Sequence, residues 1–163
     1  MLQTLLDKQA ITEVIYRLAR GLDRCDEALL RGCFHPDATD DHGIFNGTAE
    51  AFFPWVMEML HSMQSTSHSI SNVLVAFETP DTAHSESYFT AYHRLAGGED
   101  MLVAGRYLDR FTRRDDAWRI AHRRAVYDWT MTQPPSDAGW LAPPMRDLLT
   151  RGARGQGDAS YNR

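Results

Sequence analysis

The chain has 163 residues, a length that suits one domain with one hydrophobic core. Hydrophobic residues make up 43% of it and charged residues 24%, and the net charge is −5 with the arginines scattered along the sequence. Nucleic acids and anionic membranes need a continuous basic patch, so the composition excludes both as partners. No apolar run reaches the roughly 18 to 20 residues that span a bilayer, and the N-terminus lacks the basic region of a signal peptide. We therefore expect a cytoplasmic protein.

The first 33 residues carry leucine, isoleucine and valine at three- and four-residue steps, which predicts helix. Gly21 and the stretch LDRCDEALL indicate a break, after which Asp26 can cap a second short helix. The two cysteines, Cys25 and Cys33, have a spacing that fits neither a zinc site nor a redox pair, so we expect two reduced thiols that pack in the core.

The segment that follows the helices changes direction. HPDA at 35–38 predicts a turn, because a proline restricts the residue before it. Residues 38–46 predict a short hairpin with Gly43 near its tip. Thr48 can then cap a third helix, since the apolar residues after it return to helical spacing.

From residue 66 the apolar period changes to two, which predicts strands. Turn signals at 79–81, 97–98 and 115–116 divide this region into four strands. Short turns between consecutive strands favour an antiparallel meander. Helices followed by strands are typical of an α+β fold, and we expect a cone in which a curved antiparallel sheet wraps over the N-terminal helices.

We expect this single α+β cone domain to occupy residues 1–132. Residues 133–163 form a C-terminal tail, in which TQPPSDAGWLAPP cannot be a regular element and MRDLLTR can form a turn or two of helix. The tail is expected to be ordered to about residue 150 and disordered over its last dozen residues. Trp140 could cover the mouth of a pocket or a neighbouring subunit, or belong to a loosely packed tail.

A sheet curved over helices leaves a cavity, which is the default ligand site of such a fold. The predicted strands carry polar residues on both faces, among them His68, Ser71, His84 and His93. A half-polar inner face is costly unless it serves a ligand or its groups are hydrogen-bonded. Taken singly, Asp23 could be a helix cap and His68 a hydrogen-bonded structural histidine.

Three segments carry a resemblance to a known family: IYRLARGLDRCDEALLRGCFHPDA, TSHSISN and GRYLDRFTRRDDAWRIAHRRAVYDW. Together they resemble the SnoaL-like branch of the nuclear transport factor 2-like superfamily, over roughly residues 3 to 131. The branch includes cofactor-free lyases, among them dehydratases and a dehydrochlorinase. The resemblance therefore implies a lyase that eliminates water or a related group from a small, aromatic or polycyclic molecule, without a cofactor.

The resemblance also implies catalytic residues. It places Asp23 at the end of the first helix, His68 early in the strand after the third helix, and Arg124 on the last strand. His68 would remove a proton from carbon, Asp23 would hold the other ring nitrogen, and Arg124 or Tyr107 would steady the leaving group. Some relatives carry a basic residue or a tyrosine five positions before the aspartate, where this chain has Leu18.

The substrate-binding residues that we expect are Tyr16, His42, Trp55, Phe89, Val103 and Tyr107. Tyr16 or Arg20 could replace the residue missing at Leu18. His42, in the hairpin, could be a second acid or a solvated turn residue. Phe53 and Trp55 cannot both face inward from one helix, so one of them should pack elsewhere.

No metal or nucleotide cofactor is expected, because the seven histidines form no HxH or HExxH group and no glycine-rich phosphate loop is present. Rival functions remain: a non-catalytic small-molecule-binding or scaffold protein of the same fold, the β-subunit of a ring-hydroxylating dioxygenase, and an isomerase or cyclase. A homo-oligomer is expected from apolar outer strand positions, and the resemblance suggests a trimer.

Overall fold

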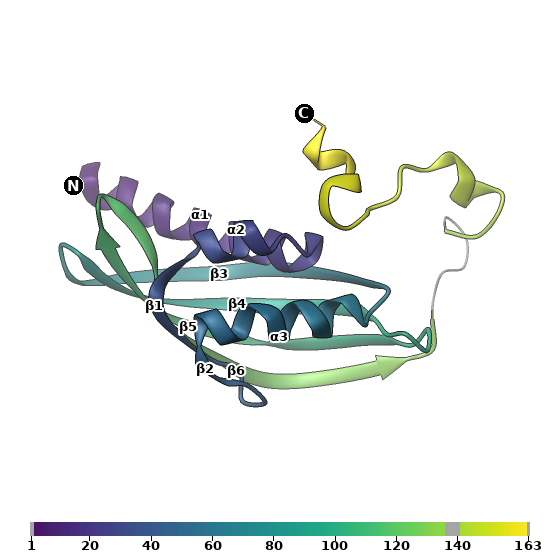
Figure 1. Ribbon diagram of the computed structural model, residues 1–163, viewed down its shortest axis with the longest axis horizontal. Helices are drawn as coiled ribbons and strands as arrows, with labels where there is room; N and C mark the ends of the chain where they lie inside the picture. Colours follow the sequence, from purple (N-terminus) through teal and green to yellow (C-terminus); the bar gives the residue numbers. More distant parts are fainter. Residues whose placement is uncertain (1, 136–140, 163) are drawn as a thin grey trace.

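The computed structural model describes residues 2–135 and 141–162, and most of its helical residues precede the long strands (Figure 1). The α-helices of this part of the chain are α1 (Leu2–Arg24), α2 (Glu27–Gly32) and α3 (Ala49–His61). The predicted caps are confirmed, since the Asp26 carboxylate accepts a hydrogen bond from the N–H of Leu29 and the Thr48 hydroxyl accepts one from Ala51.

The break between the first two helices lies within the predicted stretch, after Gly21. α1 continues through Gly21 to Arg24, and the chain turns at Cys25, which has a φ of 48°. Gly21 lies within α1 at the point where α2 packs against it. A Cβ at this position would lie 3.3 Å from the backbone nitrogen of Leu30, which belongs to α2. The glycine thus allows α2 to pack directly on α1.

The strands form one sheet in the order β2-β1-β6-β5-β4-β3. Its members are β1 (Phe34–Asp41), β2 (Asn46–Thr48), β3 (Ser65–Thr79), β4 (Thr82–Arg94), β5 (Asp100–Arg114) and β6 (Ala117–Gln133). The last four form the predicted antiparallel meander, while β1 pairs parallel to β6. The sheet is curved and does not close. Together with the helices that precede its long strands, it forms the α+β fold that the sequence predicts, and this prediction is confirmed.

The predicted turn at 35–38 is wrong, because these residues lie within β1. The pairing of β1 with β6 shifts its register between Phe34 and Thr39. Pro36 falls inside that irregular stretch, where a missing backbone N–H removes no regular ladder bond. The predicted hairpin is present, with β1 and β2 as its arms and Gly43 in its turn at a φ of 74°.

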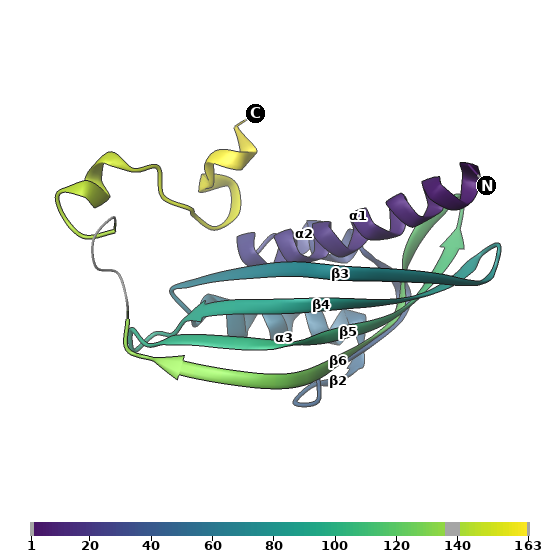
Figure 2. The same ribbon diagram turned by 180° about the vertical axis from the view of Figure 1, so that it is seen from behind.

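The helices cover one face of the sheet and leave the other face open (Figures 1 and 2). The core lies between the helices and the inner face, with buried residues such as Leu18, Phe52, Leu60, Phe111 and Ile120. The outer face exposes large apolar side chains, including those of Leu74, Tyr88, Trp129 and Met131. The expected trimer stays a prediction, and this face is the surface that it would use.

The end of the tail differs from the disorder predicted for it. Short 3-10 turns occupy Gly155–Gly157 and Ala159–Tyr161. The Arg24 guanidinium lies 2.7 Å from the Asp158 carboxylate, and the Tyr161 hydroxyl donates to Asp26 at 2.6 Å. Polar composition suggested a solvated chain, but these polar groups find partners at the end of α1.

Trp140, predicted as a possible pocket cover, lies outside the described residues. Within the described residues no helix combines the length and the apolar character needed to cross a membrane. Cys25 and Cys33 are both free thiols, as expected.

Candidate functional site

Asp23 and His68 meet where the last turn of α1 passes the start of β3. The Nδ1 atom of His68 lies 2.7 Å from Oδ1 of Asp23, and the backbone N–H of His68 donates to Oδ2 at 2.8 Å. Both side chains are largely shielded from water, with exposed fractions of 7% for His68 and 13% for Asp23. The carboxylate is therefore held at two points, and the ring cannot rotate without losing a hydrogen bond.

This contact decides which ring nitrogen carries the proton. An ionised carboxylate only accepts hydrogen bonds, so Nδ1 of a neutral His68 ring is protonated and Nε2 keeps a lone pair. Burial raises the pKa of Asp23, but the hydrogen bonds and charge of His68, together with the charge of Arg24, outweigh it and leave that pKa below 3.8. Asp23 is therefore a carboxylate, and in the neutral form of His68 the free Nε2 can accept a proton.

His68 borders a cavity of about 170 Å³ between the sheet and α3. Its apolar wall includes Leu22, Trp55, Met59, Phe89 and Val103, and its polar groups come from His42, His68, His93, Tyr107 and Tyr127. Five of the six residues predicted to bind a substrate, namely His42, Trp55, Phe89, Val103 and Tyr107, thus line one cavity. A larger, more open hollow of about 810 Å³ lies over residues such as His84 and Arg110, and neither Asp23 nor His68 borders it.

Tyr16 and Arg124 do not reach this cavity. Tyr16 is 50% exposed on the outer side of α1. The Arg124 side chain is 59% exposed and its Nε donates to Asp41 at 3.1 Å, on the outer side of the hairpin. Neighbouring residues of a strand face opposite sides of the sheet, so Arg124 points away from the cavity and the inward arginine of β6 is Arg123. Of Phe53 and Trp55, it is Phe53 that packs elsewhere, against Phe34.

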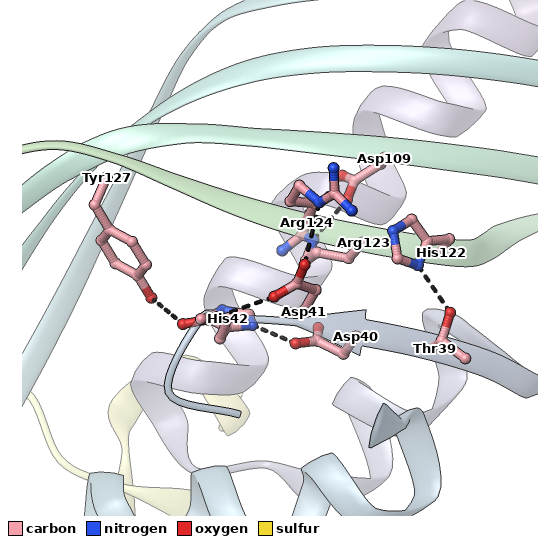
Figure 3. A network of polar contacts seen from close by, with 10 residues as sticks. Thr39, Asp40, Asp41, His42, Asp109, His122, Arg123, Arg124 and Tyr127 are labelled. Atoms are coloured by element: carbon pink, nitrogen blue, oxygen red, sulfur yellow. Dashed lines mark hydrogen bonds and ion pairs between the residues drawn. The ribbon is translucent and has the colours of Figure 1, made fainter. Parts of the chain in front are cut away.

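Arg123 belongs to a buried polar network beside the cavity (Figure 3). Its guanidinium forms two hydrogen bonds with Asp109, at 2.7 and 2.6 Å, and lies 4.0 Å from the centre of the Tyr107 ring. Burial lowers the pKa of Arg123, but the charge and hydrogen bonds of Asp109 outweigh it, so the net direction is upward. Burial raises the pKa of Tyr107 as well, which keeps this hydroxyl protonated at neutral pH.

His93 is a cavity residue to which the sequence assigned no role. It follows the inward alternation of β4, and its ring meets that of His68 edge to face with 5.7 Å between centroids. Burial, followed by the charge of His68, lowers the pKa of His93 to about 4. Its imidazole is thus neutral at pH 7 and can offer or accept a hydrogen bond beside His68.

The lowered pKa of His93 predicts a specific dependence of stability on pH. An unfolded chain binds a proton at this histidine below pH 6.5, whereas the folded protein does so only below about pH 4. Stability therefore falls as pH drops from 6.5 toward 4, by about 2 kcal/mol between pH 7 and pH 5 for this group at 1.36 kcal/mol per pKa unit. Urea unfolding of the wild type and of His93→Gln at both pH values should show a smaller loss in the variant. An equal loss in the two proteins would contradict this assignment.

Among the described residues, no group of three or more histidine, cysteine, aspartate or glutamate side chains is placed to hold a metal ion. The arrangement supplies instead a histidine–aspartate pair, a second histidine, and a tyrosine around an apolar cavity. Such a set can remove a proton from a bound molecule and hydrogen-bond the charge that develops on it.

The fold is shared with solved structures of known and unknown activity. A hexachlorocyclohexane dehydrochlorinase is 21% identical with a TM-score of 0.77, and the match covers 88% of this chain and 97% of that one. A scytalone dehydratase-like protein from Novosphingobium aromaticivorans is 22% identical with a TM-score of 0.73, covering 96% and 97%. A cystatin-like protein of unknown function from Nostoc punctiforme is 22% identical with a TM-score of 0.64, covering 76% and 92%.

Among curated proteins, none is significantly similar in sequence to this chain. The profile of the SnoaL-like domain, in contrast, matches residues 3–124, which include both members of the aspartate–histidine pair. This match confirms the resemblance drawn from the sequence motifs. The chain therefore belongs to the SnoaL-like domain family.

Proposed function

We propose that the protein is a lyase that eliminates water or a related leaving group from a small cyclic molecule, with His68 as the general base. The observation that carries this proposal is the Asp23–His68 pair, whose 2.7 Å contact leaves Nε2 for the cavity that His68 borders. The resemblance in fold to a dehydrochlorinase and a scytalone dehydratase-like protein supports elimination over other reactions.

In the proposed reaction, Nε2 of His68 takes a proton from a carbon next to an activating carbonyl group. The electron pair of that C–H bond becomes the new carbon–carbon double bond, and the bond to the leaving group breaks with its electrons. Asp23 stabilises the imidazolium that forms and holds the ring in place. General-base assistance of this kind is typically worth roughly 10²- to 10⁴-fold in rate.

The cavity limits the size of the substrate. Its volume of about 170 Å³ is below the roughly 300 to 1,000 Å³ of sites for drug-sized ligands. Aromatic rings from Trp55, Phe89 and Tyr107 line it, and Phe89 and Tyr107 stack on each other with 4.4 Å between centroids. A flat compound with one or two rings fits this wall better than a steroid does.

The proposal is tested by offering the purified protein one- and two-ring β-hydroxy ketones and β-chloro ketones, starting with 3-hydroxycyclohexanone and 3-chlorocyclohexanone. We expect an unsaturated ketone to accumulate faster than in buffer, detected by its absorbance and by the loss of water or hydrogen chloride in the mass spectrum. Deuterium on the carbon next to the carbonyl should slow the reaction, because its removal is part of the proposed step.

The same assay separates the rival functions. A binding protein of this fold would bind the compounds, as measured by calorimetry, and return them unchanged. An isomerase would also remove the proton but would give a product of unchanged mass. Either result across the panel would overturn the lyase proposal.

A further inference from the structure

The C-terminal segment packs behind the Asp23–His68 pair and not over the cavity. Within the described part of this segment, residues 141–162, no side chain lines the cavity. Residues 151–154 border instead a separate polar hollow of about 290 Å³, whose wall also includes Asp23 and the start of β3. Asp23 therefore contacts His68 and also borders the hollow that this segment helps to form.

Polar contacts attach the segment to the last two turns of α1 (Figure 1). The guanidinium of Arg24 donates to the carbonyl of Ala153 at 2.8 Å and to the carboxylate of Asp158 at 2.7 Å. One turn earlier, Arg20 donates to the hydroxyl of Ser160 at 2.9 Å. The side chains of Arg24 and Asp158 are only 20% and 10% exposed, so salt screens this ion pair less than it screens a surface pair. The segment is thus fixed to the end of α1.

Arg154 links the two parts of the chain that carry the pair. One terminal nitrogen of its guanidinium contacts Sγ of Cys25, two residues after Asp23. The other terminal nitrogen donates to the carbonyl oxygen of Met63 at 3.3 Å, five residues before His68. A guanidinium is planar and rigid, so the two contacts fix the separation of the groups that it joins. Arg154 therefore holds the end of α1 against the chain that enters β3.

Both parts that Arg154 joins lie outside helices and strands. Cys25 follows α1 with a φ of 48°, in a region that costs energy for a residue with a side chain and is kept only where surrounding contacts hold it. Met63 lies between α3 and β3. A shift of either part moves Asp23 relative to His68, and a misplacement of about 1 Å can lower a rate by about 10²-fold.

We propose that Arg154 is a positioning residue, which keeps Asp23 and His68 in contact from behind the cavity and does not touch the substrate. This inference rests on the proposed elimination, in which His68 is the base. Arg154 borders the polar hollow and not the cavity. Its loss should therefore disturb the alignment of the pair and leave the substrate-binding wall intact.

The first test examines the His68 ring without any substrate. Nitrogen NMR of the imidazole rings near neutral pH reports which ring nitrogen carries the proton, and the signals of His68 are those that disappear in His68→Gln. In the wild type, the proton of the neutral ring belongs on Nδ1, next to Asp23. In Arg154→Gln we expect a second tautomer, protonated on Nε2, to become visible.

The matched control is Arg151→Gln. Arg151 borders the same hollow, but its side chain forms no hydrogen bond or ion pair with any residue that the structure describes. Its replacement removes the same charge from the same segment without breaking a contact. The spectrum of His68 should therefore match that of the wild type.

The second test is kinetic and uses 3-hydroxycyclohexanone. In Arg154→Gln we expect kcat to fall by roughly 10- to 10²-fold with KM unchanged, because the alignment of the base is lost while the contacts to substrate remain. Arg154→Lys keeps the positive charge but replaces the rigid fork with a point charge, so it should lose kcat to a similar extent. Arg151→Gln should stay near the wild-type rate.

Each outcome decides one question. An unchanged His68 spectrum in Arg154→Gln, or a rise in KM with kcat unchanged, would overturn the positioning role. Wild-type behaviour of Arg154→Lys would overturn it as well, because charge rather than the two-pronged contact would then be sufficient. If Arg154→Gln does not fold, Asp158→Asn weakens the attachment of the same segment at Arg24 and should produce the same second tautomer, whose absence would contradict the inference. No turnover by the wild type would count against the lyase proposal alone, since the NMR test needs no substrate.

Discussion

His68→Gln is expected to abolish turnover of every substrate while the protein stays folded. The backbone N–H of residue 68 still donates to Oδ2 of Asp23, which keeps the partly buried carboxylate hydrogen-bonded. The glutamine side chain has no basic nitrogen, so the group that takes the proton from carbon in the proposed step is missing. We expect kcat/KM to fall by at least about 10²- to 10⁴-fold. Steady-state kinetics with 3-hydroxycyclohexanone and 3-chlorocyclohexanone measure the loss.

The matched control for this variant is His84→Gln. His84 lies on the next strand, its side chain is 55% exposed and bonds Glu78 at 3.2 Å, and it does not border the cavity. Its replacement should change neither the rate nor the melting temperature appreciably. Activity that survives in His68→Gln, with the control also active, would show that another group removes the proton.

Asp109→Ala is expected to have the largest effect on stability. The variant leaves the Arg123 guanidinium, whose side chain is 1% exposed, without the carboxylate that neutralises it. Removing one partner of a buried ion pair typically costs about 3 to 5 kcal/mol, because the remaining charge stays in a medium of low polarity. Urea unfolding at pH 7 measures the change in the free energy of unfolding.

Two further variants identify the cause. Asp128→Ala removes a carboxylate from an exposed pair with Arg106 on the same sheet, and such pairs are worth about 0 to 1 kcal/mol. The double replacement Asp109→Leu with Arg123→Met removes both buried charges and should recover much of the stability lost in Asp109→Ala. A double variant as unstable as the single one would mean that packing, rather than the unpaired charge, explains the loss.

The sequence predicted the elements well wherever one local signal was enough. The caps at Asp26 and Thr48 and the meander of β3–β6 follow from short patterns that their neighbours reinforce. The prediction failed at Pro36, because a proline within a strand is tolerated only where pairing is irregular, and that depends on β6, far away in the chain. It also failed at the C-terminal residues, where partners such as Arg24 decide whether a polar segment is ordered.

The candidate site was predictable to the extent that family motifs mark it. Asp23 and His68 stand out in the sequence only through the resemblance, and the structure places them in contact. The choice of Arg124 over Arg123 shows the limit of such reasoning, because a shift of one residue moves a side chain to the opposite face of the sheet. His93 and Asp40 carried no local mark that would separate them from surface residues.

Local chemistry thus accounts for which segments become helices and strands, because capping, turn formation and apolar periodicity act over a few residues. The meeting of Asp23 with His68, the burial of Asp40 behind His42, and the pairing of Arg123 with Asp109 were settled only in the folded chain. Each of these contacts depends on strand register and on burial, which determine how far a charge is removed from water. Neither is a property of a short stretch of sequence, since both arise when distant segments pack together.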